Sequence, residues 1–229
     1  MNPVNDLLFL VFPEICAVCG TGLWKYEEVI CTSCNFHLPK TNFHLDKKNQ
    51  VCRAFWGRVP IENAGAYLYF NKGSKVQRLI HQLKYKGRKD IGIYLGKQYG
   101  NYLITMPEFQ QINYIVPVPL HRKKLKLRGY NQSESFAEGL SLSMKIPVDT
   151  SSFIRTISTQ TQTRKSRFKR WENVSEIFLV ANSETLENKH ILLVDDVITT
   201  GATIESCVAT LLKVSGIKIS VAAIAFTRS

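Results

Sequence analysis

One run near the C-terminal end decides the fold of this chain: His190-Ile191-Leu192-Leu193-Val194-Asp195-Asp196-Val197-Ile198-Thr199-Thr200-Gly201-Ala202-Thr203. Its apolar residues 191–194 predict a buried strand, two carboxylates follow at the strand's end, and a Thr/Gly loop leads into a helical pattern. The glycine permits a tight turn, and the start of the helix offers unpaired N–H groups and the positive end of its dipole. The loop therefore predicts a phosphate-binding site.

Asp195 and Asp196 stand directly before that loop, where they would repel a phosphate. Carboxylates instead accept hydrogen bonds from sugar hydroxyls or bind a hydrated divalent cation. A sugar phosphate satisfies both halves of the run, because its hydroxyls meet the acids while its phosphate meets the loop. The alternative is an ordinary strand-loop-helix junction with an acidic edge. Such a junction does not require this particular order of apolar run, paired acids and Thr/Gly loop.

Length and charge limit the alternatives without choosing among them. The 229 residues allow one large domain, or a mid-sized domain with a small appendage. A hydrophobic fraction of 45% supports a packed core, and a formal net charge of +12 indicates anionic partners. Phosphates, nucleic acid and membrane headgroups all remain open as partners.

The N-terminal region contains a short apolar run at residues 7–12, which no basic residue precedes and which Pro13 interrupts. This pattern argues against a signal peptide. No other stretch approaches the roughly 20 apolar residues that a membrane span requires. We therefore expect a soluble, cytoplasmic protein without a membrane span, in which paired cysteines more often bind a metal than form disulfides.

Two Cys-x-x-Cys pairs follow, separated by eleven residues: Cys16, Cys19, Cys31 and Cys34. This spacing predicts a tetrahedral Zn²⁺ site, whose role is structural because four thiolates fill the coordination sphere. Free or disulfide-bonded thiols are the alternative, and a second matching pair argues against a thioredoxin-like redox site. Cys52 and Cys207 are left over, and the apolar spacing around Cys207 predicts a packed thiol.

The remaining chain divides at about residue 60. Residues 1–60 are predicted to hold the zinc-finger segment and, from residue 38 to 59, a connector. Residues 61–229 alternate strands and helices, which predicts an α/β domain with a mostly parallel sheet and helices on both faces. The predicted strands are 64–70, 112–118, 153–157, 173–180, 191–194 and 217–226, and the predicted helices lie near 76–83, 91–105, 133–142 and 199–215. In such sheets ligands bind beyond the carboxyl ends of the strands.

Basic residues gather in three segments. Residues 84–89 end a predicted helix in positive charge, which serves either the helix dipole or a ligand. Five basic residues within positions 122–128 are too many for one helix face, and we predict a mobile loop that grips an anion in preference to a solvated face. Residues 159–173 predict a long polar loop, in which Phe168 and Trp171 among arginines also fit a nucleic-acid surface.

Most of the chain resembles the ComF family of bacterial competence proteins, in which a four-cysteine zinc finger is joined to a type I phosphoribosyltransferase-like domain. The resemblance rests on the four cysteines, on Pro117-Val118-Pro119-Leu120-His121, on Arg128-Gly129-Tyr130-Asn131-Gln132, on residues 162–173 and on residues 194–203. It implies phosphoribosyl pyrophosphate (PRPP) or a related sugar phosphate as the ligand, Mg²⁺ bound with that ligand, structural Zn²⁺ and a role in DNA uptake.

The resemblance also assigns residues to parts of the ligand. It implies that Asp195 and Asp196 bind the ribose hydroxyls and that the 5-phosphate lies on Thr199, Thr200, Gly201, Ala202 and Thr203. It implies pyrophosphate contacts from Val118, Pro119, Leu120, His121 and Arg122, with Arg128 as a second contact, and a flexible loop over the site that carries Arg164, Arg167 and Arg170. A segment that would recognise a nucleobase is not found, so the acceptor is not indicated.

Two classes of function stay open at this point. The first is a Mg²⁺-dependent phosphoribosyltransferase, which would displace pyrophosphate from the ribose anomeric carbon. The second is a single-stranded DNA-binding accessory factor, working with other competence proteins and using the fold as a scaffold or ligand sensor. A zinc-stabilised fold with an inactive site is the third alternative.

Overall fold

The computed structural model describes residues 14–156 and 177–227. The apolar run at 7–12 and the whole of the predicted loop at 159–173 lie outside the described residues. The predicted flexible-loop arginines Arg164, Arg167 and Arg170, and the aromatics Phe168 and Trp171, lie outside them as well. Predictions that involve these residues therefore stay predictions.

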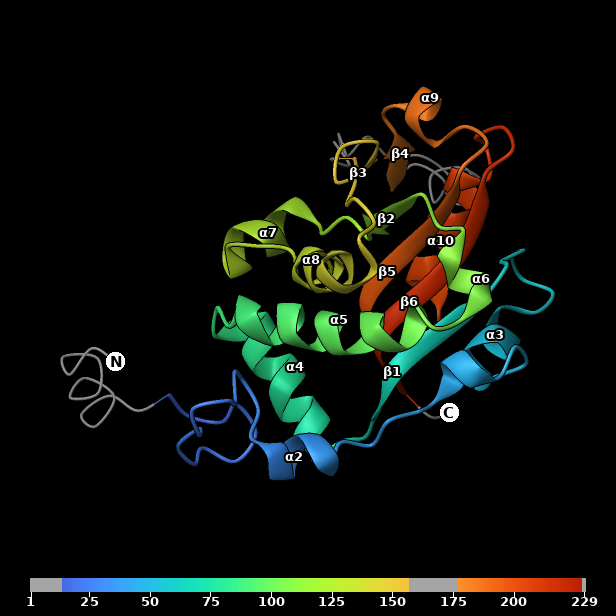
Figure 1. Cartoon of the computed structure of the whole chain (residues 1–229). Coiled ribbons are helices and arrows are strands. Elements are labelled where there is room, and N and C mark those ends of the chain that lie inside the picture. Colours follow the sequence, from blue (N-terminus) through green and yellow to red (C-terminus); the bar gives the residue numbers. More distant parts are fainter. Residues whose placement is uncertain (1–13, 157–176, 228–229) are drawn as a thin grey trace.

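A four-stranded parallel sheet forms the centre of the molecule (Figure 1). Its strand order is β1 (Ala64–Phe70), β6 (Lys218–Thr227), β5 (His190–Ile198) and β2 (Tyr114–Pro117). The two inner strands, β5 and β6, are almost continuously apolar because both of their faces are covered. The predicted α/β fold with a parallel sheet is confirmed.

Helices cover both faces of this sheet. On one face, α4 (Lys75–Tyr85), α5 (Lys89–Leu103) and α8 (Gln132–Met144) pack in one buried cluster with alternate residues of the strands. On the other face, α10 (Ala202–Leu211) and α3 (Gln50–Phe55) pack against the remaining strand residues. Helices α5 and α8 approach so closely that a Cβ at Gly96 would lie 2.3 Å from the Phe136 carbonyl oxygen.

Several elements differ from their predicted form. Strand β3 (Phe153–Arg155) pairs antiparallel with β4 (Phe178–Val180) in a separate two-stranded sheet and does not join the central one. Strand β5 continues through both aspartates to Ile198, so the acids belong to the strand itself. The structure also contains two short helices that were not predicted, α6 (Pro107–Gln110) and α9 (Ser183–Leu186).

The predicted connector at residues 38–59 is folded against the sheet. It contains the 3₁₀ helix η1 (Phe43–Leu45) and α3, and both Phe43 and Phe55 are buried in the cluster on that face. Asn49 caps α3 with its side-chain oxygen, and its amide donates a 2.7 Å hydrogen bond to the Ala64 carbonyl in β1. Backbone hydrogen bonds from Thr41 to the Tyr67 carbonyl and from Tyr69 to the Pro39 carbonyl also tie this polar stretch to the edge strand.

The basic segment at 122–128 is the helix α7 (Arg122–Arg128), so the prediction of a loop there is wrong. Its ends are well capped: the His121 ring accepts a hydrogen bond from the Lys123 N–H, and Gly129 takes the left-handed conformation with φ of 78°. None of its residues is buried. The charges need no common face because most of the helix surface is exposed to solvent.

The N-terminal cysteine segment includes α2 (Thr32–Phe36) and packs against α4. Arg78 donates a 2.7 Å hydrogen bond to the Val18 carbonyl, and Gln82 donates one to the Ala17 carbonyl. Among the helices of residues 14–156 and 177–227, none is long and apolar enough to cross a membrane.

Candidate functional site

The two aspartates lie near the carboxyl end of β5, and other elements already engage them. The carboxylate of Asp196 pairs with the Lys84 ammonium group at the end of α4, with nitrogen-to-oxygen distances of 3.0 and 2.9 Å. The Asp196 and Lys84 side chains are 14% and 21% exposed, which shields this pair from water. Asp195 accepts a 3.1 Å hydrogen bond from the Ser133 hydroxyl on α8 and a 2.8 Å bond from the Asp196 N–H.

Asp195 has an unusual electrostatic environment. Burial and, second, the neighbouring Asp196 carboxylate together raise the pKa of its carboxyl group to about 7. The hydrogen bonds from the Asp196 N–H and the Ser133 hydroxyl oppose this shift. The site therefore holds a carboxyl group that titrates near neutral pH, which is typical of functional sites.

The Thr/Gly loop follows β5 directly and starts α10. Gly201 has φ of 79°, the left-handed region that favours glycine, and a Cβ there would lie 2.8 Å from the Phe55 ring. Arg58 supports the loop from the α3 side, because it donates a 2.9 Å bond to the Thr200 carbonyl and pairs with Glu205 in α10. The outer side of the loop stays open, with Thr199, Thr200, Ala202 and Thr203 all exposed.

The Pro-Val-Pro segment ends β2 beside β5. The Val118 N–H donates a 2.8 Å bond to the Val194 carbonyl, so residues 118–122 leave the sheet at the edge where the aspartates lie. Asn131, the N-cap of α8, donates a 3.0 Å bond to the Val118 carbonyl. This bond fixes the segment against the start of α8.

The Arg-Gly-Tyr-Asn-Gln segment is a corner that ties α4, α7, α8 and the Pro-Val-Pro segment together. The Tyr130 hydroxyl donates to the Leu83 carbonyl at the end of α4. Arg128 donates a 2.5 Å bond to the Gln132 side chain, and its guanidinium lies over the Tyr85 ring, 5.4 Å from the centroid. Each polar side chain of the segment thus has a structural contact as well as its predicted place near the ligand.

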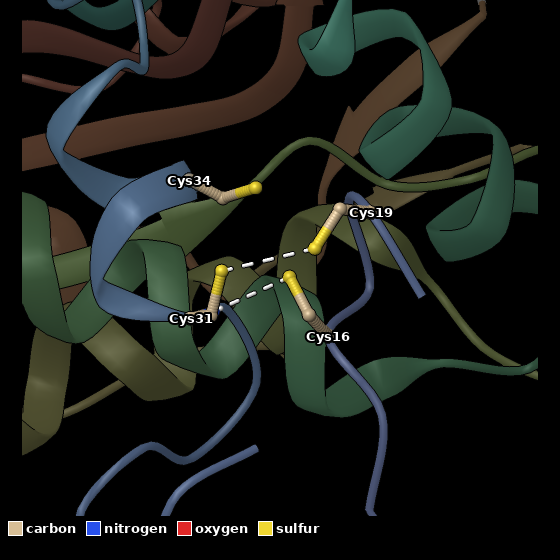
Figure 2. A group of neighbouring side chains, drawn as sticks. All are labelled: Cys16, Cys19, Cys31 and Cys34. Carbon is tan, nitrogen blue, oxygen red and sulfur yellow. Dashed lines mark hydrogen bonds between the residues drawn. The ribbon is translucent and has the colours of Figure 1, made fainter. Parts of the chain in front are cut away.

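The four cysteines converge on one point, with their sulfur atoms all within 4.8 Å of one another (Figure 2). The Cys19 and Cys31 sulfurs are 3.8 Å apart, the separation that tetrahedral coordination with metal–sulfur bonds of about 2.3 Å requires. The N–H groups of Val18 and Cys31 donate hydrogen bonds to the Cys16 sulfur. The donor set fits a metal ion such as zinc, whereas the buried Cys52 and Cys207 lie outside this cluster.

Parts of the chain are similar in sequence to known proteins. A phosphoribosyl transferase domain family matches residues 131–229. The DNA utilization protein YhgH of Escherichia coli K12 is 28% identical over 203 residues, which cover 87% of this chain and 84% of that protein. The competence protein ComFC of Bacillus subtilis is 26% identical over 208 residues, which cover 83% and 81%. Over most of its length the chain is therefore similar to proteins named for DNA utilization and for competence.

A solved structure is similar at a lower level. The glutamine PRPP amidotransferase of B. subtilis, complexed with ADP and GMP, shares 19% identity across 62% of this chain and 30% of its own, with a TM-score of 0.42. A similarity this low carries no argument about the ligand of the present chain.

The structure brings the predicted ribose and phosphate residues to one edge of the sheet and adds three residues that were not predicted from the sequence. Lys84 is the counter-ion of Asp196, Ser133 bonds Asp195, and Arg58 holds the Thr200 carbonyl. The basic run at 84–89 was a signal for Lys84. Ser133 and Arg58 lie in a helix start and a supposed connector, where the sequence offers no such signal.

Proposed function

We propose that this protein is a member of the ComF family and that it binds PRPP or a related sugar phosphate at the carboxyl edge of β5. Asp195 and Asp196 would accept hydrogen bonds from the ribose hydroxyls, and the 5-phosphate would lie on residues 199–203. One observation carries the proposal: adjacent carboxylates at the end of an inner parallel strand lead directly into a left-handed glycine and the start of α10. That order offers acceptors for a sugar and backbone donors for an anion side by side.

The pyrophosphate would lie on the β2 side of the ribose. Residues 118–122 leave the sheet beside β5, which supports the predicted contacts from Val118, Pro119, Leu120, His121 and Arg122. Arg128 would turn its guanidinium toward the same group, although it rests over the Tyr85 ring in the structure. Arginine suits this role because its planar fork binds phosphate oxygens in pairs.

Mg²⁺ would enter with the ligand. The carboxylates of Asp195 and Asp196 are oxygen donors of the kind that Mg²⁺ prefers, and they would hold it together with ligand oxygens. The bound cation would supply charge neutralisation of the pyrophosphate. Asp196 would first have to exchange the Lys84 ammonium group for the ligand, and the displaced lysine would stay close to the incoming phosphates.

Titration of the purified protein with PRPP and Mg²⁺ by calorimetry tests this site. We expect the wild type to bind with a dissociation constant in the micromolar range and the Asp195→Ala/Asp196→Ala variant to lose at least about 50-fold in affinity, because the sugar acceptors are gone. Lys189→Ala is the matched control, since it lies before β5 at the opposite end of the strand and should bind like the wild type. No detectable binding by the wild type would sink the proposal.

The biological role we propose is DNA uptake during natural competence, in line with the names of its relatives. A phosphoribosyl transfer to an acceptor is compatible with the site, and the acceptor is left open. We also propose that zinc fills the four-cysteine cluster in a structural role, that the protein works in the cytoplasm, and that residues 1–60 and 61–229 are its two domains.

A second function, binding of single-stranded DNA as an accessory factor, is favoured by the charge. The net charge of +12 on 229 residues exceeds what one bound sugar phosphate requires. Phosphates along a nucleic-acid strand would meet many of these charges at once.

A further inference from the structure

Most of the net positive charge of the chain comes from one stretch of sequence that contains two of the three basic segments. Residues 71–133 contain thirteen lysines and arginines and two acids, Asp90 and Glu108. This stretch alone has a net charge of +11, nearly all of the +12 of the whole chain. Local charge of one sign on this scale indicates a surface that meets an anion larger than a single phosphate group.

The fold brings two parts of this stretch together. Nine of the thirteen basic residues lie where α4 runs into α5 and on the helix α7, which we call the basic corner (Figure 1): Lys84, Lys86, Arg88, Lys89, Arg122, Lys123, Lys124, Lys126 and Arg128. Two cation–π contacts join the parts, Arg128 over Tyr85 at 5.4 Å and Lys89 over Tyr130 at 5.1 Å. Within the described chain, only Lys84 and Arg88 of the nine form ion pairs.

Helix α7 lacks the apolar face with which a helix packs against another helix or a membrane. None of its residues is buried, and its two apolar side chains, Leu125 and Leu127, are 41% and 78% exposed. They stand two positions apart and so point about 200° apart around the helix axis, which leaves no single apolar face. An interfacial helix would need such a face.

An exposed aromatic side chain lies in the middle of the basic corner. Tyr85 is 60% exposed, with the His81 ring 5.0 Å from it on one side and the Arg128 guanidinium on another. Planar groups of this kind are where unpaired bases stack, and arginine adds a cation–π contribution. Bases in a duplex are already stacked on each other and cannot use such a platform.

We propose that the basic corner binds single-stranded nucleic acid. The phosphates of the nucleic acid would contact Lys86, Lys89 and the α7 lysines. One of its bases would stack on the Tyr85 ring and the Arg128 guanidinium. Recognition would be independent of sequence, since lysines on phosphates and a base on an aromatic ring read no base edge. The inference locates the second function proposed above, and it does not require the sugar-phosphate site to be occupied.

Fluorescence anisotropy with a labelled thymidine 20-mer over a salt series tests the proposal. The variant Lys123→Gln/Lys124→Gln/Lys126→Gln should bind about tenfold more weakly at 0.1 M salt. The slope of log affinity against log salt should become shallower by about 2, because each lost phosphate contact removes about 0.7. Tyr85→Leu should weaken binding about fivefold with the slope unchanged, since stacking releases no counterions.

The matched control is Lys189→Gln/Lys213→Gln/Lys218→Gln, which removes the same charge at the amino ends of β5 and β6. It should retain affinity and slope within twofold. No binding by the wild type, or equal losses in the two triple variants, would overturn the proposal. Tighter binding to vesicles of anionic phospholipid than to the 20-mer would also overturn the proposal, if the α7 triple variant lost affinity for the vesicles and kept its affinity for the 20-mer.

The sugar-phosphate proposal can be tested independently of the nucleic-acid proposal. The α7 triple variant leaves the proposed PRPP contacts untouched and should bind PRPP and Mg²⁺ like the wild type in calorimetry. A protein that binds the 20-mer through the basic corner but not PRPP would refute the first proposal and support this one. A protein that binds PRPP but not the 20-mer would support the sugar-phosphate proposal and refute this one.

Discussion

Replacing Cys31 with serine is expected to release the metal from the four-cysteine cluster and to lower the melting temperature by about 10 °C or more. Structural zinc supplies about 10 kcal/mol to isolated fingers, and each kcal/mol is worth about 2–4 °C in a protein of this size. Cys31 is buried beside the Cys16 sulfur, to which its own N–H donates. Loss of its thiolate leaves three ligands and an open position that water can enter.

The effect should extend beyond the cluster, since the cysteine segment packs in the same core as α4 and α5. Zinc content by mass spectrometry and thermal unfolding by circular dichroism give the two readouts. Cys52→Ser is the matched control, because this buried thiol lies outside the cluster and should leave one zinc per chain. A wild-type protein without stoichiometric metal, or a Cys31→Ser variant that keeps it, contradicts the assignment.

Replacing Asp195 with asparagine is expected to stabilise the protein at neutral and alkaline pH while removing PRPP binding. Burial, together with the adjacent Asp196 carboxylate, raises the pKa of the Asp195 carboxyl group from 3.8 to about 7. An acidic group whose pKa is raised in the folded state does not lower the free energy of unfolding at a pH below its unfolded pKa. As the pH rises from there toward the folded pKa, the group lowers the free energy of unfolding more and more. At pH 8 this cost is up to about 4 kcal/mol, at 1.36 kcal/mol per pKa unit.

Asparagine keeps the oxygen that accepts from Ser133 and from the Asp196 N–H, but it carries no charge. The stability gain of the Asp195→Asn variant should therefore increase by about 2–3 kcal/mol between pH 5 and pH 8. Urea unfolding at intervals of half a pH unit measures this gain. A gain that stays flat or shrinks with pH would show that Asp195 is not a buried carboxyl held near its pKa.

Asp196→Asn provides the contrast on the adjacent residue. It breaks the pair with Lys84 and leaves that ammonium group partly buried without a partner, so it should destabilise the protein by about 1–2 kcal/mol at pH 8. Opposite signs for two neighbouring aspartates would be hard to explain by general damage to the strand. The opposite signs are expected if Asp196 is paired with Lys84 and Asp195 is a buried carboxyl group without a cationic partner of its own.

The sequence predicted the parallel sheet because its evidence is local. Apolar runs such as residues 191–194 and 217–226 can be buried only as inner strands, and the helices between them force a parallel arrangement. The cysteine cluster was predictable for the same reason, since the spacing of its ligands within each pair nearly fixes its geometry.

The errors arose where tertiary contacts decide local structure. Residues 38–59 lack a clear period, yet Phe43 and Phe55 are buried and the Asn49 amide bonds to β1. The error at residues 122–128 has a local cause instead: they carry too much charge for an amphipathic pattern, yet His121 and Gly129 cap the two ends of a helix there. The partners of the acids, Lys84 and Ser133, come from two helices far apart in sequence, and only the fold shows that they meet at β5.

A crystal structure of the protein with PRPP and Mg²⁺ bound tests the central claim most directly. The account predicts the ribose hydroxyls on Asp195 and Asp196, the 5-phosphate on the Thr199–Thr203 loop and the pyrophosphate beside residues 118–122. Lys84 should have left Asp196. A ligand bound elsewhere, such as on the basic corner, with the Lys84–Asp196 pair intact and the loop free, would contradict it.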